Sequence, residues 1–104
     1  MDQDTVLNTI HDFKNALKSM DIKVDNLILF GSYSVNRASE ESDIDLVVIS
    51  NSFANKSYWE RIDILSEAVF KVFAPIEPIA MTPGEWKSKK SLIVDYAKNG
   101  IWIK

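Results

Sequence analysis

The stretch at 43–50, Asp-Ile-Asp-Leu-Val-Val-Ile-Ser, restricts the fold of this chain more than any other. Its β-branched and apolar residues predict a strand. Because strand side chains alternate, Asp43 and Asp45 share one face with Val47 and Ile49. That face changes from acidic to apolar within one strand. We therefore expect the two aspartates at the end of a buried strand, where the sheet reaches solvent.

Three helices are predicted from apolar residues that recur at steps of three and four. The first covers about 4–20, and its inner face is Val6, Ile10, Phe13, Leu17 and Met20. The second begins at the capping box Ser57-Tyr-Trp-Glu60 and runs to about 73, with an inner face of Ile62, Leu65, Val69, Val72 and Phe73. The third begins at the capping box Thr82-Pro-Gly-Glu85 and runs to about 98, with Trp86, Leu92, Ile93 and Tyr96 inward.

Three further strands are predicted at 27–30, 76–81 and 101–103. Pro78 has no backbone N–H, so the strand at 76–81 should lie at a sheet edge or be irregular. The order helix, strand, strand, helix, strand, helix, strand predicts an α/β sheet fold. The 104 residues support one domain, 1–104.

Composition excludes several kinds of site. The chain has no cysteine and one histidine, so a metal would be held by oxygen, which favours magnesium, manganese or calcium. The net charge of −3 and pI near 5.0 argue against generic nucleic-acid binding. No apolar run approaches the roughly 20 residues of a membrane span, and the N-terminal residues do not resemble a signal peptide. We expect a cytoplasmic protein.

The aspartate pair is the first candidate for chemistry. Two carboxylates about 5 Å apart repel by roughly 3 kcal/mol at an effective dielectric near 20, and a divalent cation relieves that repulsion. Glu77 lies on the predicted strand 76–81, and a neighbouring strand is about 4.8 Å away. Glu77 is therefore predicted to complete a three-carboxylate cluster, as a metal ligand or as the base that accepts a proton. The alternative is three solvated acids at strand ends.

Gly31-Ser32 is the second candidate, because it ends the predicted strand at 27–30. A glycine lets backbone N–H groups approach a phosphate without a Cβ in the way, and the serine hydroxyl adds a donor. Arg37 follows in the loop and suits phosphate geometry. The alternatives are a strand-ending turn, a helix cap and a solvated loop arginine. Trp59 falls in the first turn of a predicted helix, where an exposed aromatic would mark a partner surface.

The two candidate motifs, Gly31-Ser32 and Asp43-x-Asp45, are separated by a defined number of residues. Asp-x-Asp alone occurs by chance in roughly one such chain in three, but Gly-Ser at one distance upstream reduces this to a few per thousand. Gly31-Ser32, a ten-residue gap and Asp43-Ile44-Asp45 resemble the signature of the DNA polymerase beta-like nucleotidyltransferase superfamily. The spacing is similar to that of its minimal branch, the MNT antitoxins that pair with HEPN-domain toxins.

The resemblance implies a mixed β-sheet packed against helices, Mg²⁺ or Mn²⁺ on the carboxylates, and transfer of a nucleoside monophosphate, usually AMP from ATP. In MNT antitoxins the acceptor is a tyrosine of the partner toxin. Larger relatives carry an added helical domain for the acceptor, so here we expect a separate molecule to supply it. Two rival hypotheses stay open: a protein that docks on a toxin with a vestigial site, and a nucleotide-binding module without transfer. The short strand edges also leave a homo-oligomer open.

Overall fold

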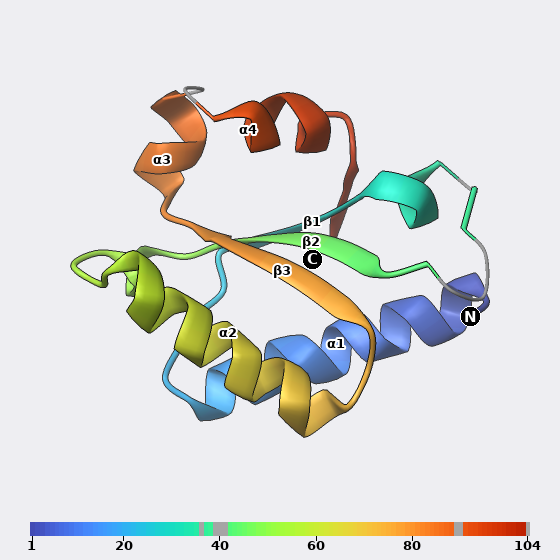
Figure 1. Cartoon of the computed structure of the whole chain (residues 1–104), viewed down its shortest axis with the longest axis horizontal. Helices are drawn as coiled ribbons and strands as arrows, with labels where there is room; N and C mark the ends of the chain where they lie inside the picture. The colour runs from blue at the N-terminus through green and yellow to red at the C-terminus, as the bar shows by residue number, and fades with distance from the viewer. Residues whose placement is uncertain (36, 39–41, 89–90, 104) are drawn as a thin grey trace.

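The computed structural model describes residues 1–35, 37–38, 42–88 and 91–103. A four-stranded sheet in the order β3-β2-β1-β4 separates two layers of helices (Figure 1). The strands are β1 (Asn26–Phe30), β2 (Ile44–Ile49), β3 (Ile76–Met81) and β4 (Ile101–Ile103). The helices are α1 (Gln3–Ser19), α2 (Tyr58–Val72), α3 (Pro83–Ser88) and α4 (Leu92–Ala97), with short 3-10 turns η1 (Gly31–Ser34) and η2 (Asn51–Phe53).

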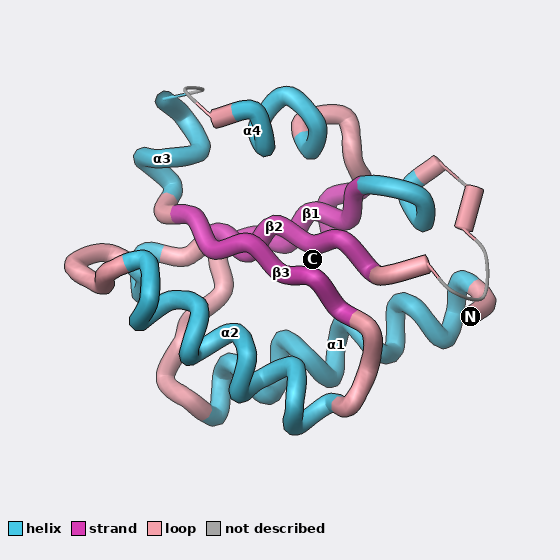
Figure 2. The backbone as a smooth tube through the Cα atoms, viewed as in Figure 1, coloured by secondary structure: helices cyan, strands magenta, loops and turns pink. Residues whose placement is uncertain are grey.

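The sheet is mixed. β1 pairs antiparallel with both β2 and β4, whereas β2 and β3 are parallel and are joined through α2. Figure 2 shows the strands as a central layer, with α1 and α2 on one side and α3 and α4 on the other. The predicted α/β (α+β) fold, a mixed sheet packed against helices, is confirmed.

Alternation along the strands sorts the core into two parts. Even-numbered residues of β2 face α1 and α2, where Leu46 and Val48 join the larger cluster with Ile10 and Phe13. Odd-numbered residues face α3 and α4, where Val47 and Ile49 pack with Val94 and Ala97. We call these the α1–α2 face and the α3–α4 face. Asp45 stands in the odd-numbered set, so the acidic and apolar residues share the α3–α4 face as predicted.

Both predicted capping boxes are present. The Ser57 hydroxyl accepts from the Glu60 N–H at 3.1 Å, and the Glu60 carboxylate accepts from the Ser57 N–H at 3.0 Å. The same exchange joins Thr82 and Glu85, at 3.1 and 2.8 Å. Each box satisfies two N–H groups that a helix leaves unpaired at its start, which explains why α2 and α3 begin where the sequence predicts.

One helix prediction is wrong. The single helix expected from 83 to about 98 is two short helices, α3 and α4, and residues 89–90 between them lie outside the described part of the chain. Ser91 caps α4, because its hydroxyl accepts from the Ile93 N–H at 3.2 Å. The restart rotates the apolar face, so Val94 and Ala97 are buried. Leu92 and Tyr96, which were predicted to point inward, are 71% and 70% exposed.

The inner face of α2 also ends earlier than predicted. Phe73 is 89% exposed instead of buried. It follows the last residue of α2 with a φ of 56°, and its N–H donates to the Val69 carbonyl. This left-handed residue ends the helix and turns its own side chain away from the core.

β3 is an edge strand, as Pro78 predicts. Ile44 N–H donates to the Pro75 carbonyl at 2.7 Å, and Ser50 N–H donates to the Met81 carbonyl at 2.9 Å. These bonds fix the phase of the parallel ladder, so the backbone groups of 77, 79 and 81 turn toward β2 and those of 76, 78 and 80 turn outward. Pro78 therefore occupies a position where its missing N–H costs no ladder bond.

None of the described helices combines the length and hydropathy that a bilayer crossing requires.

Candidate active site

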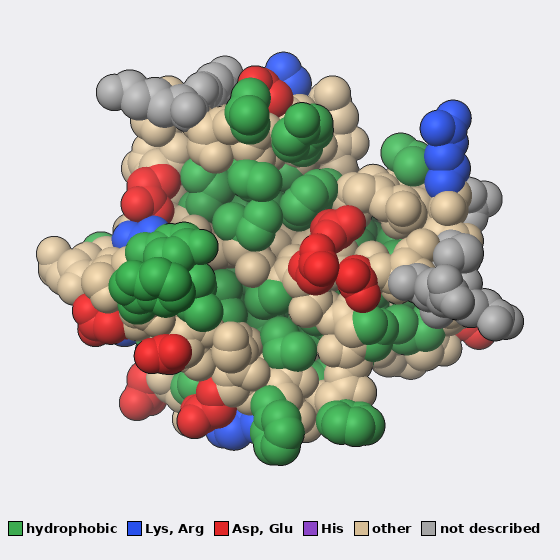
Figure 3. Space-filling model, viewed as in Figure 1, with side chains coloured by type: hydrophobic (Ala, Val, Ile, Leu, Met, Phe, Trp, Pro, Cys, Tyr) green, Lys and Arg blue, Asp and Glu red, His purple; other side chains and the backbone are tan. Residues whose placement is uncertain are grey.

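Three carboxylates meet where β2 and β3 begin. Asp45 and Glu77 are register partners on these parallel strands, and Asp43 immediately precedes β2. Asp43 and Glu77 are exposed, and Asp45 is half-buried. Acidic side chains gather near the middle of the face seen in Figure 3, next to an apolar surface. The structure thus brings together the three acids that were singled out from the sequence.

The three acids interact strongly. A hydrogen bond with Asp43 and the negative charge of Asp43 raise the pKa of Glu77, with further contributions from burial and from Asp45. Burial raises the pKa of Asp45, the charge of Asp43 raises it further, and a hydrogen bond with Glu77 opposes the rise. The raised pKa values of Asp45 and Glu77 mean that each of these two carboxylates takes up a proton more readily than a separate acid would.

The donor set fits a hard divalent cation, because every donor is a carboxylate oxygen. In the arrangement described here the carboxyl groups turn toward one another. Within the described ranges, no three His, Cys, Asp or Glu side chains are arranged as metal ligands. A divalent cation bound by these carboxylates would relieve their mutual repulsion.

Gly31 lies directly against Asp45. It follows β1 with a φ of 73°, a conformation that favours glycine. A Cβ at this position would be 2.2 Å from Asp45 Oδ2. The sequence suggested that this glycine leaves room for a phosphate, and the structure gives it a second role, since the missing Cβ also leaves room for the Asp45 carboxylate.

The other predicted phosphate contacts lie in and after η1. Ser32 is the second residue of η1, and its carbonyl accepts from the Arg37 N–H at 2.9 Å. The side chain of Arg37 is exposed, and neither ion pair recorded among the described residues includes it. Ser32 thus follows the glycine that lies against Asp45, and Arg37 lies in the connection between η1 and β2.

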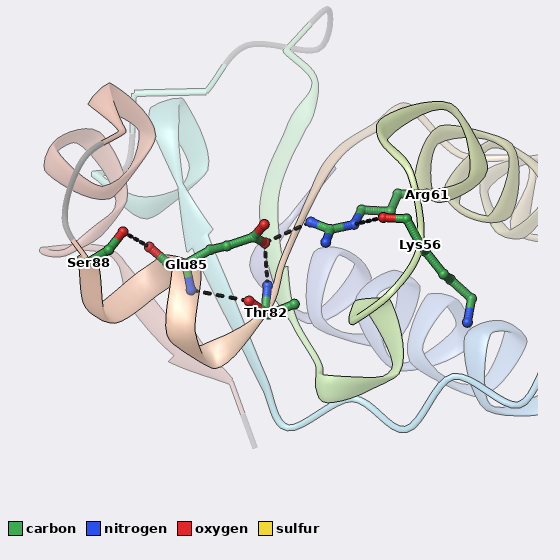
Figure 4. Close-up of polar contacts among 5 residues, drawn as sticks. All are labelled: Lys56, Arg61, Thr82, Glu85 and Ser88. Carbon is green, nitrogen blue, oxygen red and sulfur yellow. Dashed lines mark hydrogen bonds and ion pairs between the residues drawn. The ribbon is translucent and has the colours of Figure 1, made fainter.

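An ion pair at the far end of β3 was not foreseen. Arg61 of α2 and Glu85 of α3 meet at 2.7 Å, beside Thr82 at the end of β3 (Figure 4). Arg61 Nε also donates to the Lys56 carbonyl at 3.2 Å. The capping box gave the position of Glu85, but no sequence signal pairs it with a residue 24 positions earlier.

Two adjoining clefts run along β3 on the α2 side. A cleft of about 200 Å³ is lined by Ile62, Leu65, Ser66, Val69, Ile76 and Pro78. A second cleft of about 630 Å³ shares Ile62, Leu65 and Pro78 with it and continues to Tyr58, Arg61 and Glu85. We call the two together the β3 groove. It extends from the residues that flank Glu77 to the ion pair.

The chain matches the model of the nucleotidyltransferase domain family over residues 10–102. It is also similar to a crystal structure of a Sulfolobus solfataricus protein assigned as a nucleotidyltransferase, with a TM-score of 0.70 and 18% sequence identity. The match covers 96% of this chain and 80% of that one. A search of curated protein sequences gives no match. Because the family model covers most of the sequence, the chain belongs to the nucleotidyltransferase domain family.

Proposed function

From this membership, we propose that the protein transfers a nucleoside monophosphate, AMP from ATP, to a hydroxyl group of a partner protein. The observation that carries the proposal is the meeting of Asp43, Asp45 and Glu77 beside the backbone of Gly31. Nucleotidyl transfer needs negative charge held next to a phosphate-binding loop, so that cations and phosphates are fixed together. Residues 1–104 act as one domain in this proposal.

Asp43, Asp45 and Glu77 would hold Mg²⁺ or Mn²⁺, because their donors are all oxygen. A bound ion of this kind supplies charge neutralisation at the phosphoryl group. The strands of the chain hold the carboxylates in position. Asp45 is half-buried between β1 and β3, where Phe30 and Glu77 are its register partners, so its backbone is fixed on both sides.

Glu77 is the acid closest to an arriving acceptor, because β3 is the edge strand and β2 lies behind it. This position suits Glu77 to accept the proton of the acceptor hydroxyl. Gly31 and Ser32 contact the phosphates through backbone N–H groups and the serine hydroxyl. Arg37 reaches the triphosphate only if its exposed side chain folds back toward Ser32.

The partner is a protein in this proposal, and the spacing of Gly31-Ser32 and Asp43-x-Asp45 supports a HEPN-type toxin through the resemblance to MNT antitoxins. Two exposed aromatic residues at the start of α2 support a protein partner independently. Tyr58 and Trp59 are 68% and 71% exposed, and their rings pack edge to face at 5.2 Å. Aromatic residues of this kind are enriched in protein interfaces.

The test is incubation of the protein with α-labelled ATP, Mg²⁺ and the product of the neighbouring gene. We expect label on the partner with the wild type and none with Asp43→Asn/Asp45→Asn. A matched control, Asp4→Asn/Asp12→Asn, removes two exposed carboxylates from α1 and should label the partner fully. Equal labelling by the Asp43→Asn/Asp45→Asn protein would refute the assignment.

A second function is a toxin-docking protein that binds nucleotide without transferring it. The observation in its favour is that Glu77 interacts with Asp43 and Asp45 through hydrogen bonds, while no three His, Cys, Asp or Glu side chains of the described residues are arranged as metal ligands. This function predicts that Asp43→Asn/Asp45→Asn still protects cells that express the toxin. Transfer predicts loss of protection, so survival of co-expressing cells separates the two.

A further inference from the structure

We infer that the outward side of α2 binds a helix of the acceptor protein that is apolar at both ends and basic at its centre. The inference rests on the proposed function for the identity of the partner, but the docking itself is argued from the side chains of α2. The surface is formed by five exposed residues, Trp59, Glu60, Asp63, Glu67 and Phe70. We call it the α2 outer face.

The α2 outer face lies opposite the buried side of its own helix. At 3.6 residues per turn, its five residues fall within an arc of about 100° that is centred opposite Leu65 and Ala68. Leu65 and Ala68 are buried and anchor α2 in the larger core cluster. Trp59 and Phe70 are 71% and 78% exposed, so the described part of the chain leaves this face open.

Large aromatic side chains lie at both ends of the face. Trp59 packs edge to face against Tyr58 in the first turn of α2, and Phe70 lies in the last turn, about 16 Å further along at 1.5 Å per residue. Phe73 follows the helix directly and is 89% exposed. Figure 3 shows the same order, with apolar side chains over both ends of α2 and acidic side chains between them. Exposed apolar surface of this size marks an interaction site.

The centre of the face is negative. Asp63 and Glu67 are one helical turn apart between the aromatic ends, and neither of the two ion pairs recorded among the described residues includes them. Glu60 adds a third carboxylate, and Lys71, one turn after Glu67, offsets one charge. Lysine or arginine at the centre of the partner would complement this charge.

The same charge argues against two other occupants. A second copy that packed this face on itself about a twofold axis would place Asp63 and Glu67 against the same carboxylates, which is repulsive. A bilayer would accept the aromatic side chains, but the central carboxylates would meet the negative surface of anionic lipids. A partner protein with a basic centre avoids both repulsions.

The shape of the face favours a helix as the partner. Trp59, Asp63 and Glu67 form a row at steps of four residues, and such rows pack into the grooves of another helix. A crossing close to parallel lets one partner helix contact both aromatic ends at the same time. Residues 73–75 join the C-terminal end of α2 to β3, whose second residue is Glu77. The partner is thus bound on the element that leads directly into the acid cluster.

The probes are two fluorescein-labelled helical peptides of about 18 residues. Both carry leucines spaced as the aromatic residues of the α2 outer face are, and the first has lysines between them where the second has glutamates. Binding is followed by fluorescence anisotropy without ATP. We expect the lysine peptide to bind the wild type at least about tenfold more tightly, and Asp63→Lys/Glu67→Lys to reverse this preference. Asp4→Lys/Asp12→Lys on α1 is the charge control and should leave the preference unchanged.

The aromatic ends are tested separately. Trp59→Gln/Phe70→Gln keeps residues that favour a helix and should weaken the lysine peptide at least about tenfold. Leu92→Gln/Tyr96→Gln, at two exposed apolar positions of α4, is the matched control and should bind as the wild type does. Equal affinity for the two peptides, or wild-type affinity in Trp59→Gln/Phe70→Gln, would overturn the inference. If that variant fails to fold, the charge reversal decides.

Two further measurements test the other occupants. Sedimentation equilibrium that shows a wild-type dimer, and a monomer for Trp59→Gln/Phe70→Gln, would overturn the inference in favour of a second copy. Binding to vesicles of phosphatidylcholine and phosphatidylserine that the same substitutions abolish would overturn it in favour of a membrane. We expect neither result.

Labelled ATP, Mg²⁺ and the product of the neighbouring gene separate this inference from the proposed function. At low partner concentration the wild type should label the partner at least about tenfold faster than Trp59→Gln/Phe70→Gln does. Peptide binding as expected, with no labelling by the wild type, leaves the docking surface standing and counts against transfer. Equal labelling by the two proteins leaves transfer standing and refutes the docking surface.

Discussion

The Asp45 carboxylate occupies the space that a side chain at Gly31 would need. The glycine has a φ of 73°, and a Cβ there would lie 2.2 Å from the Asp45 carboxylate oxygen. The loop residue proposed to contact phosphate and the aspartate proposed to hold the cation are thus in direct contact, although they stand 14 positions apart in the sequence. A change at the first must alter the second.

Gly31→Ala should therefore reduce the rate of nucleotidyl transfer more than it reduces the free energy of unfolding. The left-handed conformation costs about 1–2 kcal/mol with a Cβ, and the Asp45 carboxylate must rotate away. We expect transfer to fall at least about tenfold, because a displacement near 1 Å at a reacting centre is costly. Urea unfolding and transfer assays measure the two effects.

The control for this substitution is Gly84→Ala in α3. The atom nearest to an added Cβ there is the Thr82 hydroxyl at 3.9 Å, so nothing has to move. It should leave transfer unchanged and raise the free energy of unfolding by up to about 1 kcal/mol, because alanine favours a helix. Equal activity of the two variants would contradict the role given to Gly31.

Magnesium should stabilise the wild type and reverse the order of stability between the wild type and Asp43→Asn/Asp45→Asn. In EDTA, Asp43→Asn/Asp45→Asn should melt at a higher temperature than the wild type, because it lacks the carboxylate repulsion. Saturating Mg²⁺ should raise the free energy of unfolding of the wild type by about 1–3 kcal/mol and leave the variant unchanged. Differential scanning calorimetry checks both halves. A wild type that is insensitive to Mg²⁺ would count against the metal site.

The Arg61–Glu85 pair should make stability fall in acid. The Arg61 guanidinium donates to Glu85 and holds the pKa of that carboxyl below its ordinary 4.5, opposed by partial burial and assisted by the Thr82 N–H. Because the pKa is lower in the folded state, this stabilisation is present above pH 4.5 and is lost as the pH falls through the lowered value. Glu85 is 46% exposed, so the contribution is about 0.5–1 kcal/mol.

Comparison with Glu85→Gln isolates this contribution. The glutamine still offers an oxygen to the Thr82 N–H but carries no charge. The wild type should be more stable at pH 7, and the difference between the two proteins should shrink as the pH falls from 4.5 through the lowered pKa of Glu85. Guanidinium unfolding over a series of pH values from 7 into the acid range, with Glu67→Gln as the exposed control on α2, measures the difference. A difference that does not change with pH would show that the charge of Glu85 contributes nothing.

Gly100→Ala should destabilise the fold without touching the site. A Cβ at Gly100 would lie 2.4 Å from the Leu29 carbonyl, which is backbone and cannot rotate away. The link between α4 and β4 must shift, at a cost of about 2–3 kcal/mol. The melting temperature should fall while Mg²⁺ still stabilises the variant. A melting temperature equal to that of the wild type would show that the strand end adapts freely.

Phe73→Gly should stabilise the protein. Phe73 has a left-handed φ of 56° at the end of α2 and is 89% exposed, so a glycine removes backbone strain and little packing. We expect a gain of about 0.5–1 kcal/mol. Phe70→Gly, at another exposed aromatic inside α2, should cost about 1 kcal/mol instead. Urea unfolding of both variants gives the sign, and a loss in Phe73→Gly would contradict it.

Short sequence patterns correctly predicted the elements that are determined by residues close together in the chain. The stripe Val6, Ile10, Phe13, Leu17 is buried, and the two capping boxes start α2 and α3. Pro78 indicated the edge strand. The meeting of Asp45 with Glu77 followed from alternation together with the position of an adjacent strand.

The spacing of apolar residues alone could not predict where the structure differs from the expected helices. The apolar spacing of Leu92 and Tyr96 is that of an inward face, but Ser91 starts a new helix and rotates them outward. Phe73 continues the spacing of α2 beyond the point where the backbone turns left-handed. The pairing of Arg61 with Glu85 depends on two helices packing on opposite sides of one strand, so only the tertiary fold brings them together.

The shared face of β2 has a consequence for folding. A slip of β2 by one residue against both of its neighbours, β1 and β3, would send Val47 and Ile49 away from α4 and would separate Asp45 from Glu77 at the same time. Core assembly and assembly of the acid cluster are thus one event. A chain that misfolds in this way exposes apolar surface at the same time as it separates the acids, so a register that lacks the acid cluster is also an unstable one.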